Sequence, residues 1–188
     1  MSGILAGRSL PPLVGTHSPA TEEYEHLPLG RWSCTESDVI QAFDVINDPR
    51  RNELWTGWKQ HLDLVRQSAG SVAACWLSGT FFTSKEHPGD IDSVYIVSAE
   101  QYRRMSGQQL LQWNFAFAGT EVHGLDLDAF PLFWDPHTGT VVDTQEASDY
   151  VRSRGYWDDL WSRMRGPNRS PDPRPRRGYV EVIIDGYK

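Results

Sequence analysis

The chain has 188 residues, of which 39% are hydrophobic and 12% aromatic, including eight Trp. This length favours one domain with a sizeable core, and the apolar content excludes a chain that stays disordered. The formal net charge of −7 argues against a general nucleic-acid coat protein, because such proteins neutralise phosphates with Lys and Arg. No stretch approaches the roughly 20 apolar residues that span a bilayer, so we expect a cytoplasmic protein with no membrane partner.

Residues 1–30 are rich in Gly, Pro, Ser and Thr and show no sustained hydrophobic period. This composition predicts an N-terminal arm ahead of a single domain over residues 31–188. Residues 1–14 contain one basic residue and two prolines, which does not fit a secretory signal. The two cysteines, Cys34 and Cys75, are too far apart in sequence to suggest a zinc site or a redox pair.

Two helices are expected before the first long strand. Thr35 and Asp38 have the spacing of a helix cap, and a short apolar period follows them. Asp48 and Pro49 are suited to cap and start a second helix, and Gly70 is a natural stop. Its core-facing side chains recur at helical spacing: Leu54, Trp58, Leu62 and Val65.

The hydrophobic period then changes to that of strands. Residues 71–78 and 90–98 read as two strands separated by a loop over 79–89. Residues 99–118 carry helical signals that break near Ser106 and Gly107.

The remainder of the chain adds further elements of both kinds. A third strand is expected over 124–133, ending near Pro131, and Thr144 can cap a helix running to about Arg165. Residues 166–178 read as a loop in which the prolines exclude helix. Residues 179–184 read as a strand that joins the same sheet. The expected fold is therefore α+β, a mixed sheet flanked by helices with the N-terminal helices packed on the core.

Four residues form the constellation that carries chemistry. Asp90 and Asp92 lie two apart in a strand, so both carboxylates project from one face. Two like charges held together call for a positive partner, and a hard divalent cation with oxygen ligands is the usual one. Upstream of them, Gly79 and Thr80 end the preceding strand, with nine residues between Thr80 and Asp90. Gly79 allows close approach of the backbone to a phosphate, to which the Thr80 hydroxyl and the loop amides can donate.

This arrangement resembles the signature of the DNA polymerase beta-like nucleotidyltransferase superfamily, a glycine and a small hydroxyl residue followed by a pair of acids. The wider stretch 76–92 is similar to a bacterial and phage group of predicted nucleotidyltransferases of uncharacterised function. That group most often has Ser in place of Thr80, and Thr keeps the hydroxyl. Supporting segments are residues 27–30, 49–51 and 177–178.

The resemblance implies a nucleotidyltransferase-like fold and a site for two Mg²⁺ ions that bridge a nucleoside triphosphate. Asp90 and Asp92 would bind the ions, together with a third carboxylate on a neighbouring strand. Asp126 and Asp128 are both candidates, and being two apart in a strand they share one face. The resemblance favours Asp126, which could also accept the proton of the acceptor.

Lys85 lies between the two halves of the motif, where it would either contact the β- or γ-phosphate or remain a solvated loop lysine. His87 and His123 lack a Cys or a second His at zinc-ligand spacing, so neither receives a role. A basic tail would either hold RNA or triphosphate oxygens or form a charged surface loop. Its members are Arg163, Arg165, Arg169, Arg174, Arg176 and Arg177.

By resemblance, the expected activity is transfer of a nucleoside monophosphate from a nucleoside triphosphate such as ATP. The acceptor is RNA, a protein hydroxyl or a small molecule, and a toxin or phage-defence role would add a cognate antitoxin or another partner protein. The alternative is a catalytically inactive nucleotide-binding or protein-interaction module with the same fold. The sequence does not identify the acceptor or the base of the nucleotide.

Overall fold

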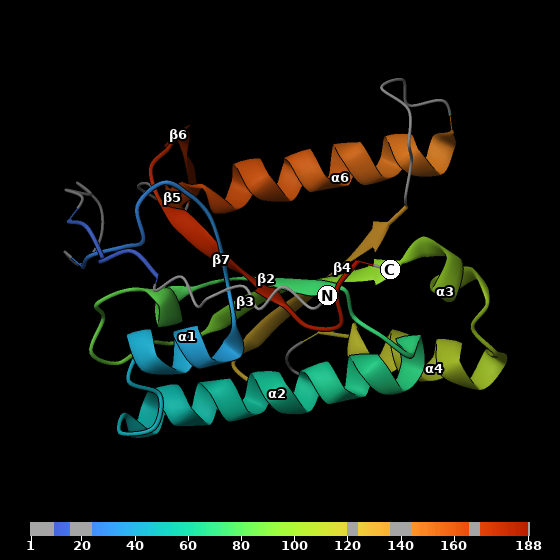
Figure 1. Cartoon of the computed structure of the whole chain (residues 1–188), viewed down its shortest axis with the longest axis horizontal. Coiled ribbons are helices and arrows are strands. Elements are labelled where there is room, and N and C mark those ends of the chain that lie inside the picture. Colours follow the sequence, from blue (N-terminus) through green and yellow to red (C-terminus); the bar gives the residue numbers. More distant parts are fainter. Residues whose placement is uncertain (1–9, 16–23, 120–123, 136–143, 166–169, 188) are drawn as a thin grey trace, which may run out of the picture.

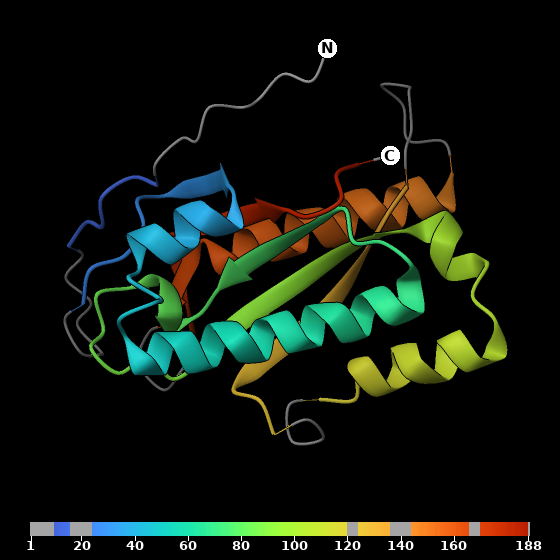
Figure 2. The same ribbon diagram turned by 60° about the horizontal axis from the view of Figure 1, so that its bottom comes forward.

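The computed structural model describes residues 10–15, 24–119, 124–135, 144–165 and 170–187. They form a five-stranded mixed sheet with helices against both faces and a separate two-stranded sheet, which confirms an α+β fold (Figures 1 and 2). None of the helices in these ranges is long and apolar enough to cross a membrane. In chain order the elements are β1 (Gly30–Cys34), α1 (Glu36–Ala42), α2 (Pro49–Ala69), β2 (Ala74–Ser78), η1 (Thr80–Phe82), β3 (Ile91–Ser98), α3 (Ala99–Arg103), α4 (Gly107–Ala116), β4 (Leu127–Trp134), α6 (Gln145–Trp161), β5 (Arg163–Arg165), β6 (Pro171–Pro175) and β7 (Gly178–Ile183).

The strand order β1-β7-β2-β3-β4 places the last strand of the chain inside the sheet. β7 runs parallel to β1 and antiparallel to β2, whereas β3 runs antiparallel to β2 and parallel to β4. The strand expected near the C-terminus therefore joins the sheet, as predicted. β1 was not predicted, because its five residues alternate polar and apolar side chains too briefly to show a period and depend on pairing with β7.

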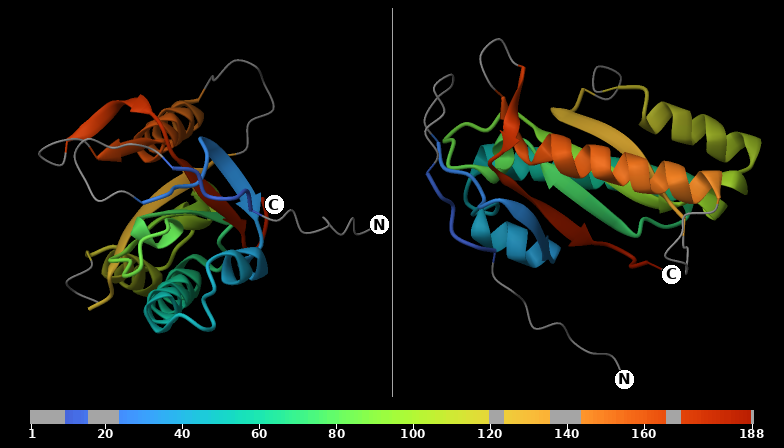
Figure 3. Two further views of the ribbon diagram at one scale, coloured as in Figure 1. Left: turned by 90° about the vertical axis from the view of Figure 1, so that its left-hand side faces the viewer. Right: turned by 90° about the horizontal axis from the view of Figure 1, so that it is seen from above.

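Two apolar layers cover the sheet, one on each face. Along β3, Ile91, Tyr95 and Val97 belong to the cluster that α1 and α2 cover, while Val94 and Ile96 belong to the cluster under α6. This alternation follows from the period of two in a strand. Figure 3 shows α2 and α6 on opposite sides of the sheet.

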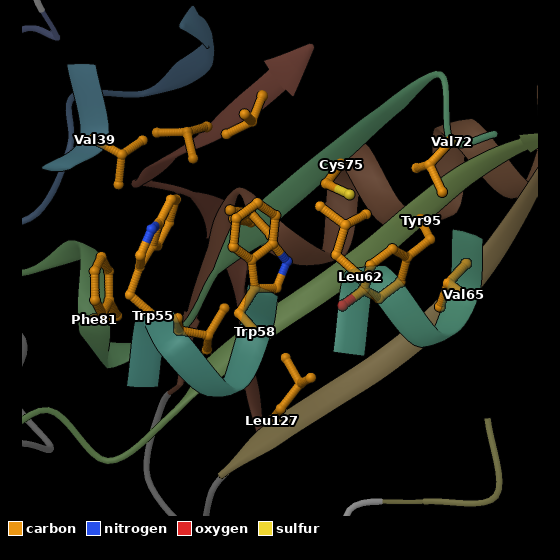
Figure 4. Close-up of a cluster of buried hydrophobic side chains, with 14 of the residues drawn as sticks. Val39, Trp55, Trp58, Leu62, Val65, Val72, Cys75, Phe81, Tyr95 and Leu127 are labelled. Atoms are coloured by element: carbon orange, nitrogen blue, oxygen red, sulfur yellow. The ribbon is translucent and has the colours of Figure 1, made fainter. Parts of the chain in front are cut away.

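The long helix α2 supplies much of the first core layer (Figure 4). Trp58 is fully buried, and its indole N–H donates to Ser93 Oγ at 3.3 Å. His61 is also buried, with one ring nitrogen 2.8 Å from the Tyr95 hydroxyl and the other 2.8 Å from the carbonyl oxygen of Ala116. The expectation that the apolar side of this helix packs in the core is confirmed.

The helix ends follow the expected local signals. Thr35 and Asp38 form a capping box, in which each side chain accepts from the backbone N–H of the other residue. Asp48 caps α2, and Gly70, at φ 82°, ends it. Ser106 caps α4, which accounts for the predicted break between α3 and α4.

β4 runs through Pro131 to Trp134, which corrects the expected end near Pro131. The N–H of Ile91 donates to the carbonyl oxygen of Asp126 at 3.1 Å. Given this parallel register, the odd-numbered residues of β4 turn their N–H and C=O groups away from β3. A proline at an odd position of this edge strand therefore costs no hydrogen bond of the ladder.

The segment expected as a loop over 166–178 contains strand β6, which pairs antiparallel with β5. The preceding helix was expected to reach Arg165 but ends at Trp161, because the chain there turns into β5. The prolines exclude helix as predicted, but they do not exclude a strand here. Both strands of a two-stranded sheet are edge strands, where a missing N–H is tolerated.

Gly178 lies against the chain at Pro28 and Gly30. A Cβ at this position would overlap the carbonyl oxygen of Pro28 and lie 2.8 Å from that of Gly30. We expect Gly178→Ala to lower the free energy of unfolding by about 1–3 kcal/mol, measured by urea unfolding. Gly155→Ala in α6 is the control, because its Cβ would meet nothing within 4 Å and should raise stability by up to about 1 kcal/mol. Equal stability of Gly178→Ala and the wild type would contradict this contact.

Candidate functional site

The turn after β2 can be made only by glycine. Gly79 has φ 97°, and a Cβ there would lie 2.8 Å from the carbonyl oxygen of Asp90 and 3.0 Å from the amide nitrogen of Asp92. Both neighbours are backbone atoms, which cannot rotate away. The glycine therefore lets the start of η1 lie directly against the beginning of β3.

The Thr80 side chain joins the two halves of the sequence motif. Its hydroxyl donates to Asp90 Oδ1 at 2.7 Å, and its backbone N–H donates to the same oxygen at 2.8 Å. The hydroxyl oxygen in turn accepts from the N–H of Gly89 at 2.7 Å. The structure thus brings Gly79, Thr80 and Asp90 together.

Asp92 and Asp128 occupy equivalent positions on neighbouring strands. They are direct partners in the parallel register of β3 and β4, and Asp92 is also paired with Ser78 of β2. Paired residues of parallel strands project from the same face, with backbones about 4.8 Å apart. That face is the one covered by α6, because Val94, two residues after Asp92, belongs to the α6 cluster.

Asp126 is held by the helix on the other face of the sheet. Its Oδ2 accepts from Arg50 Nη2 at 2.6 Å, and 60% of its side chain is exposed. The same guanidinium donates to the carbonyl oxygens of Gly89 and Pro88, each at 3.0 Å, and to Glu53 at 2.7 Å. The hydrogen bonds to Asp126 and Glu53 raise the pKa of Arg50. Asp126 is therefore already paired with a cation.

The acids beside the motif are candidate ligands for a metal ion. Within the described ranges, no group of three Asp, Glu, His or Cys side chains is placed to hold a metal ion. The donor set nevertheless suits a hard divalent cation, because Asp92 and Asp128 offer carboxylate oxygens from adjacent positions. Asp90 Oδ1 accepts from Thr80, so Asp90 could offer a cation its other carboxylate oxygen, or both oxygens if its side chain turns away from Thr80.

Arg51 holds the loop that separates the two halves of the motif. Its buried guanidinium donates to the carbonyl oxygen of Phe81 and, at 2.9 Å each, to those of Thr83 and Lys85. Burial lowers the pKa of Arg51, although Asp48, whose Oδ2 lies 3.3 Å from Nε, acts in the opposite direction. The backbone of Lys85 is thus fixed from inside the protein.

Sequence reasoning assigned no role to Arg50 or Arg51. The sequence does indicate where these two arginines lie, because Asp48 and Pro49 mark the start of a helix. The two arginines therefore project from its first turn. Which segment that turn would meet depends on tertiary packing, and no local pattern reports it.

Residues 24–28, here called the N-terminal strap, cross the same loop. The N–H of Glu25 donates to Ser84 Oγ at 2.7 Å, and the N–H of Ser84 donates to the carbonyl oxygen of Glu25 at 3.0 Å. On the other side, the N–H of Gly178 donates to the carbonyl oxygen of Leu27 at 2.9 Å. Part of the segment expected as an arm therefore links the motif loop to the start of β7.

The described arginines of the basic tail lie beside acids or backbone acceptors. Arg163 pairs with Asp159 at 2.8 Å, and Arg174 and Arg176 lie 3.5 and 3.1 Å from the carboxylate of Asp172. Much of their charge is therefore compensated locally. Arg177 Nε donates to the carbonyl oxygen of Trp161. Arg169, His123 and the side chain of Arg165 lie outside the described part of the chain, and His87 is exposed.

A hollow of about 740 Å³ lies on the α6 face of the sheet, between α6 and β1. Its lining includes Arg31, Arg154, Asp158 and Tyr179, whose hydroxyl donates to Asp158. The volume is within the range of small-molecule sites. Tyr179 belongs to β7, so β2 is the strand that lies between this lining and β3, which carries Asp92.

The Arg51 contacts predict a large cost for removing its guanidinium. We expect Arg51→Met to lower the free energy of unfolding by about 2 kcal/mol or more, because buried carbonyl groups lose their donor. Urea denaturation would measure this change. Arg104→Met removes an exposed ion pair within one helix and should cost less than about 0.5 kcal/mol. Similar costs for the two variants would show that the loop does not depend on Arg51.

His26 predicts a pH dependence of stability. This strap residue is buried beside Arg177, and burial first, then the Arg177 charge, lowers its pKa from 6.5 to about 4. Folding therefore favours the neutral ring, so this contribution to stability is complete above pH 6.5 and is lost as the pH falls toward 4. His26→Leu should reduce the fall in unfolding free energy between pH 6.5 and 4. An unchanged pH slope in this variant would contradict the assignment.

Residues 19–183 match a protein family described as a family of unknown function (DUF6932). Comparisons with curated proteins and with solved structures found no match. The description of the family carries no activity, so function rests on the chemistry of the site. Since the match covers most of the sequence, the chain belongs to this family of unknown function.

Proposed function

We propose that the chain is a metal-dependent nucleotidyltransferase with a nucleotidyltransferase-like fold. It transfers a nucleoside monophosphate from a nucleoside triphosphate to an acceptor hydroxyl: the acceptor oxygen bonds to the α-phosphorus, the bond between the α- and β-phosphates breaks, and pyrophosphate leaves. The observation that carries this proposal is the pair of hydrogen bonds from Thr80, in the turn that Gly79 begins, to Asp90. Two further acids, Asp92 and Asp128, are paired on one face of the sheet. A phosphate-binding turn next to carboxylates is the combination that metal-assisted phosphoryl chemistry requires.

The bonds between Thr80 and Asp90 suggest how the site takes up its substrate. Asp90 Oδ1 now accepts from both the hydroxyl and the N–H of Thr80. When Asp90 turns toward a cation, these two donors are released, and both can then donate to a phosphate oxygen. The positive φ of Gly79 keeps the turn free of a side chain at this point. Lys85 is proposed as a further phosphate contact from the anchored loop.

Asp128 replaces Asp126 in this proposal as the third carboxylate. Asp128 is the direct register partner of Asp92, whereas Asp126 is paired with Arg50. Mg²⁺ bound by Asp90, Asp92 and Asp128 would neutralise triphosphate charge and favour ionisation of the acceptor hydroxyl. Asp128 is exposed on an edge strand, so its carboxylate is also open to accept the proton of the acceptor.

The local pairing of the tail arginines favours a small molecule or a protein hydroxyl over RNA as the acceptor, because the described part of the tail offers little uncompensated positive charge.

A second candidate function is an inactive nucleotide-binding module. It is favoured by the engagement of Asp90 with Thr80 and by the lack of three assembled ligands in the described residues. A toxin or phage-defence role, with an antitoxin partner, rests on the resemblance alone.

The proposal predicts which acids are needed for activity. Purified protein with Mg²⁺ and each α-labelled nucleoside triphosphate, supplied with cell extract as the source of acceptor, should transfer label. Asp92→Asn and Asp128→Asn should each lower the rate about 100-fold or more, because each removes charge stabilisation of the reacting phosphate. Asp126→Asn, the matched control on the same strand, should lower it less than about tenfold.

The outcomes separate the two candidate functions. Nucleotide binding without transfer under all conditions would favour the inactive module. Loss of transfer in Asp126→Asn but not in Asp128→Asn would overturn the assignment of the third carboxylate. Absence of both transfer and Mg²⁺-dependent nucleotide binding would overturn the proposed function.

A further inference from the structure

A second hollow, of about 320 Å³, opens at the outer edge of β4. Its lining comes from α3, from the last part of β4 and from α6 between Glu146 and Trp157. Phe133 in this lining lies five residues after Asp128, so about 16 Å of strand separates the hollow from the candidate active site. In Figure 1, the end of β4 and the start of α6 both lie at the end of the molecule where α3 is found.

Aromatic side chains make up much of this lining. Tyr102, Tyr150 and Trp157 all contribute to it. The Tyr102 ring packs 4.5 Å from that of Phe133, and the Trp157 ring packs 4.6 Å from that of Phe130, so neighbouring rings hold both in place. Aromatic rings attract cations through their negative faces.

Two carboxylates complete the lining. Glu146 and Asp149 lie in the first turns of α6, three residues apart and thus on one side of the helix. Acidic side chains near the first turn of a helix interact favourably with the positive end of the helix dipole. Asp149 accepts from Gln145 at 2.7 Å and lies 4.0 Å from Arg152 Nη1, and the Arg154 guanidinium lies 5.9 Å from the centroid of the Tyr150 ring. Among the described residues that line the hollow, Arg103 is the one cation, and it is exposed. The charge of the lining is therefore net negative.

The hollow also borders the open edge of the sheet. β4 is an edge strand, and its register turns the N–H and C=O groups of Phe133 and the C=O group of Pro131 away from β3. An extended polypeptide can add to such an edge, with alternate side chains entering adjacent pockets. The volume is at the lower limit for small-molecule sites, which suits one side chain better than a whole cofactor.

We propose that this hollow, the β4-edge pocket, receives a lysine or arginine side chain of a partner polypeptide that lies along the outer edge of β4. The aromatic rings pack on the aliphatic stem and face the cation, and Glu146 and Asp149 pair with its charge. The formal net charge of −7 attracts such a basic partner over longer distances. This interaction does not depend on the proposed catalytic activity.

The test uses the full chain and two acetylated pentapeptides, Thr-Val-Lys-Val-Thr and the same peptide with norleucine replacing lysine. NMR titration should show that the lysine peptide shifts the amide signals of Phe133, Glu146 and Trp157, and that norleucine weakens binding at least about fivefold. Glu146→Gln/Asp149→Asn should cause a similar loss. The matched control, Asp63→Asn/Glu86→Gln, removes the same charge outside the pocket and should leave the affinity within about twofold.

Four results would overturn the proposal. The lysine peptide could leave the pocket signals unchanged, or the norleucine peptide could bind equally well, which would indicate a purely apolar groove. The control variant could lose as much affinity as the pocket variant, which would indicate diffuse attraction to an acidic protein. Spermidine could shift the pocket signals while the peptide does not, which would make a free polyamine the occupant. The comparison of peptides uses the wild type, so it stands even if a variant fails to fold.

Discussion

The buried guanidinium of Arg51 is the contact on which the candidate site depends. Three carbonyl oxygens of the motif loop accept hydrogen bonds from it, and two of these bonds, to Phe81 and Thr83, are buried, so those carbonyls are costly to leave unpaired. The neighbouring Arg50 does the same for the two residues just before Asp90. Since both arginines arise from the first turn of α2, which is packed through Trp58 into the core, the position of the loop is set by the most buried helix of the fold.

The sheet then determines which acids can act together. A parallel register between β3 and β4 places Asp92 and Asp128 side by side, and the same register leaves Asp126 just outside the strand, where Arg50 compensates its charge. One residue of slip would turn Asp128 to the other face. The arrangement of the acids is therefore a consequence of strand pairing, and that pairing is fixed by the apolar side chains of β3 and β4 that alternate with the acids.

Local signals in the sequence were sufficient where the deciding interactions are local. The capping box at Thr35, the start of α2 at Asp48 and the Gly79–Thr80 turn could all be read from neighbouring residues. The preference for Asp126 over Asp128 followed from a resemblance, and spacing alone could not decide between them because both share a face. They differ in their tertiary contacts, because the pairing of β4 with β3 places Asp128 opposite Asp92, whereas Arg50 pairs with Asp126. β1 was missed because it depends on β7, a partner strand distant in sequence. The β5–β6 pair is local, but the prolines of β6 hide the signal of a strand.

The proposed chemistry follows from a competition at Asp90. One carboxylate oxygen satisfies two donors of Thr80, which stabilises the turn when no cation is present. Asp92 and Asp128 are direct register partners, so both could supply oxygens to one divalent cation. In the proposed reaction such a cation would compete with Thr80 for the Asp90 carboxylate, and the donors of Thr80 would then be released for phosphate. Cation and triphosphate binding should therefore reinforce each other, because each favours the same rotation of one side chain.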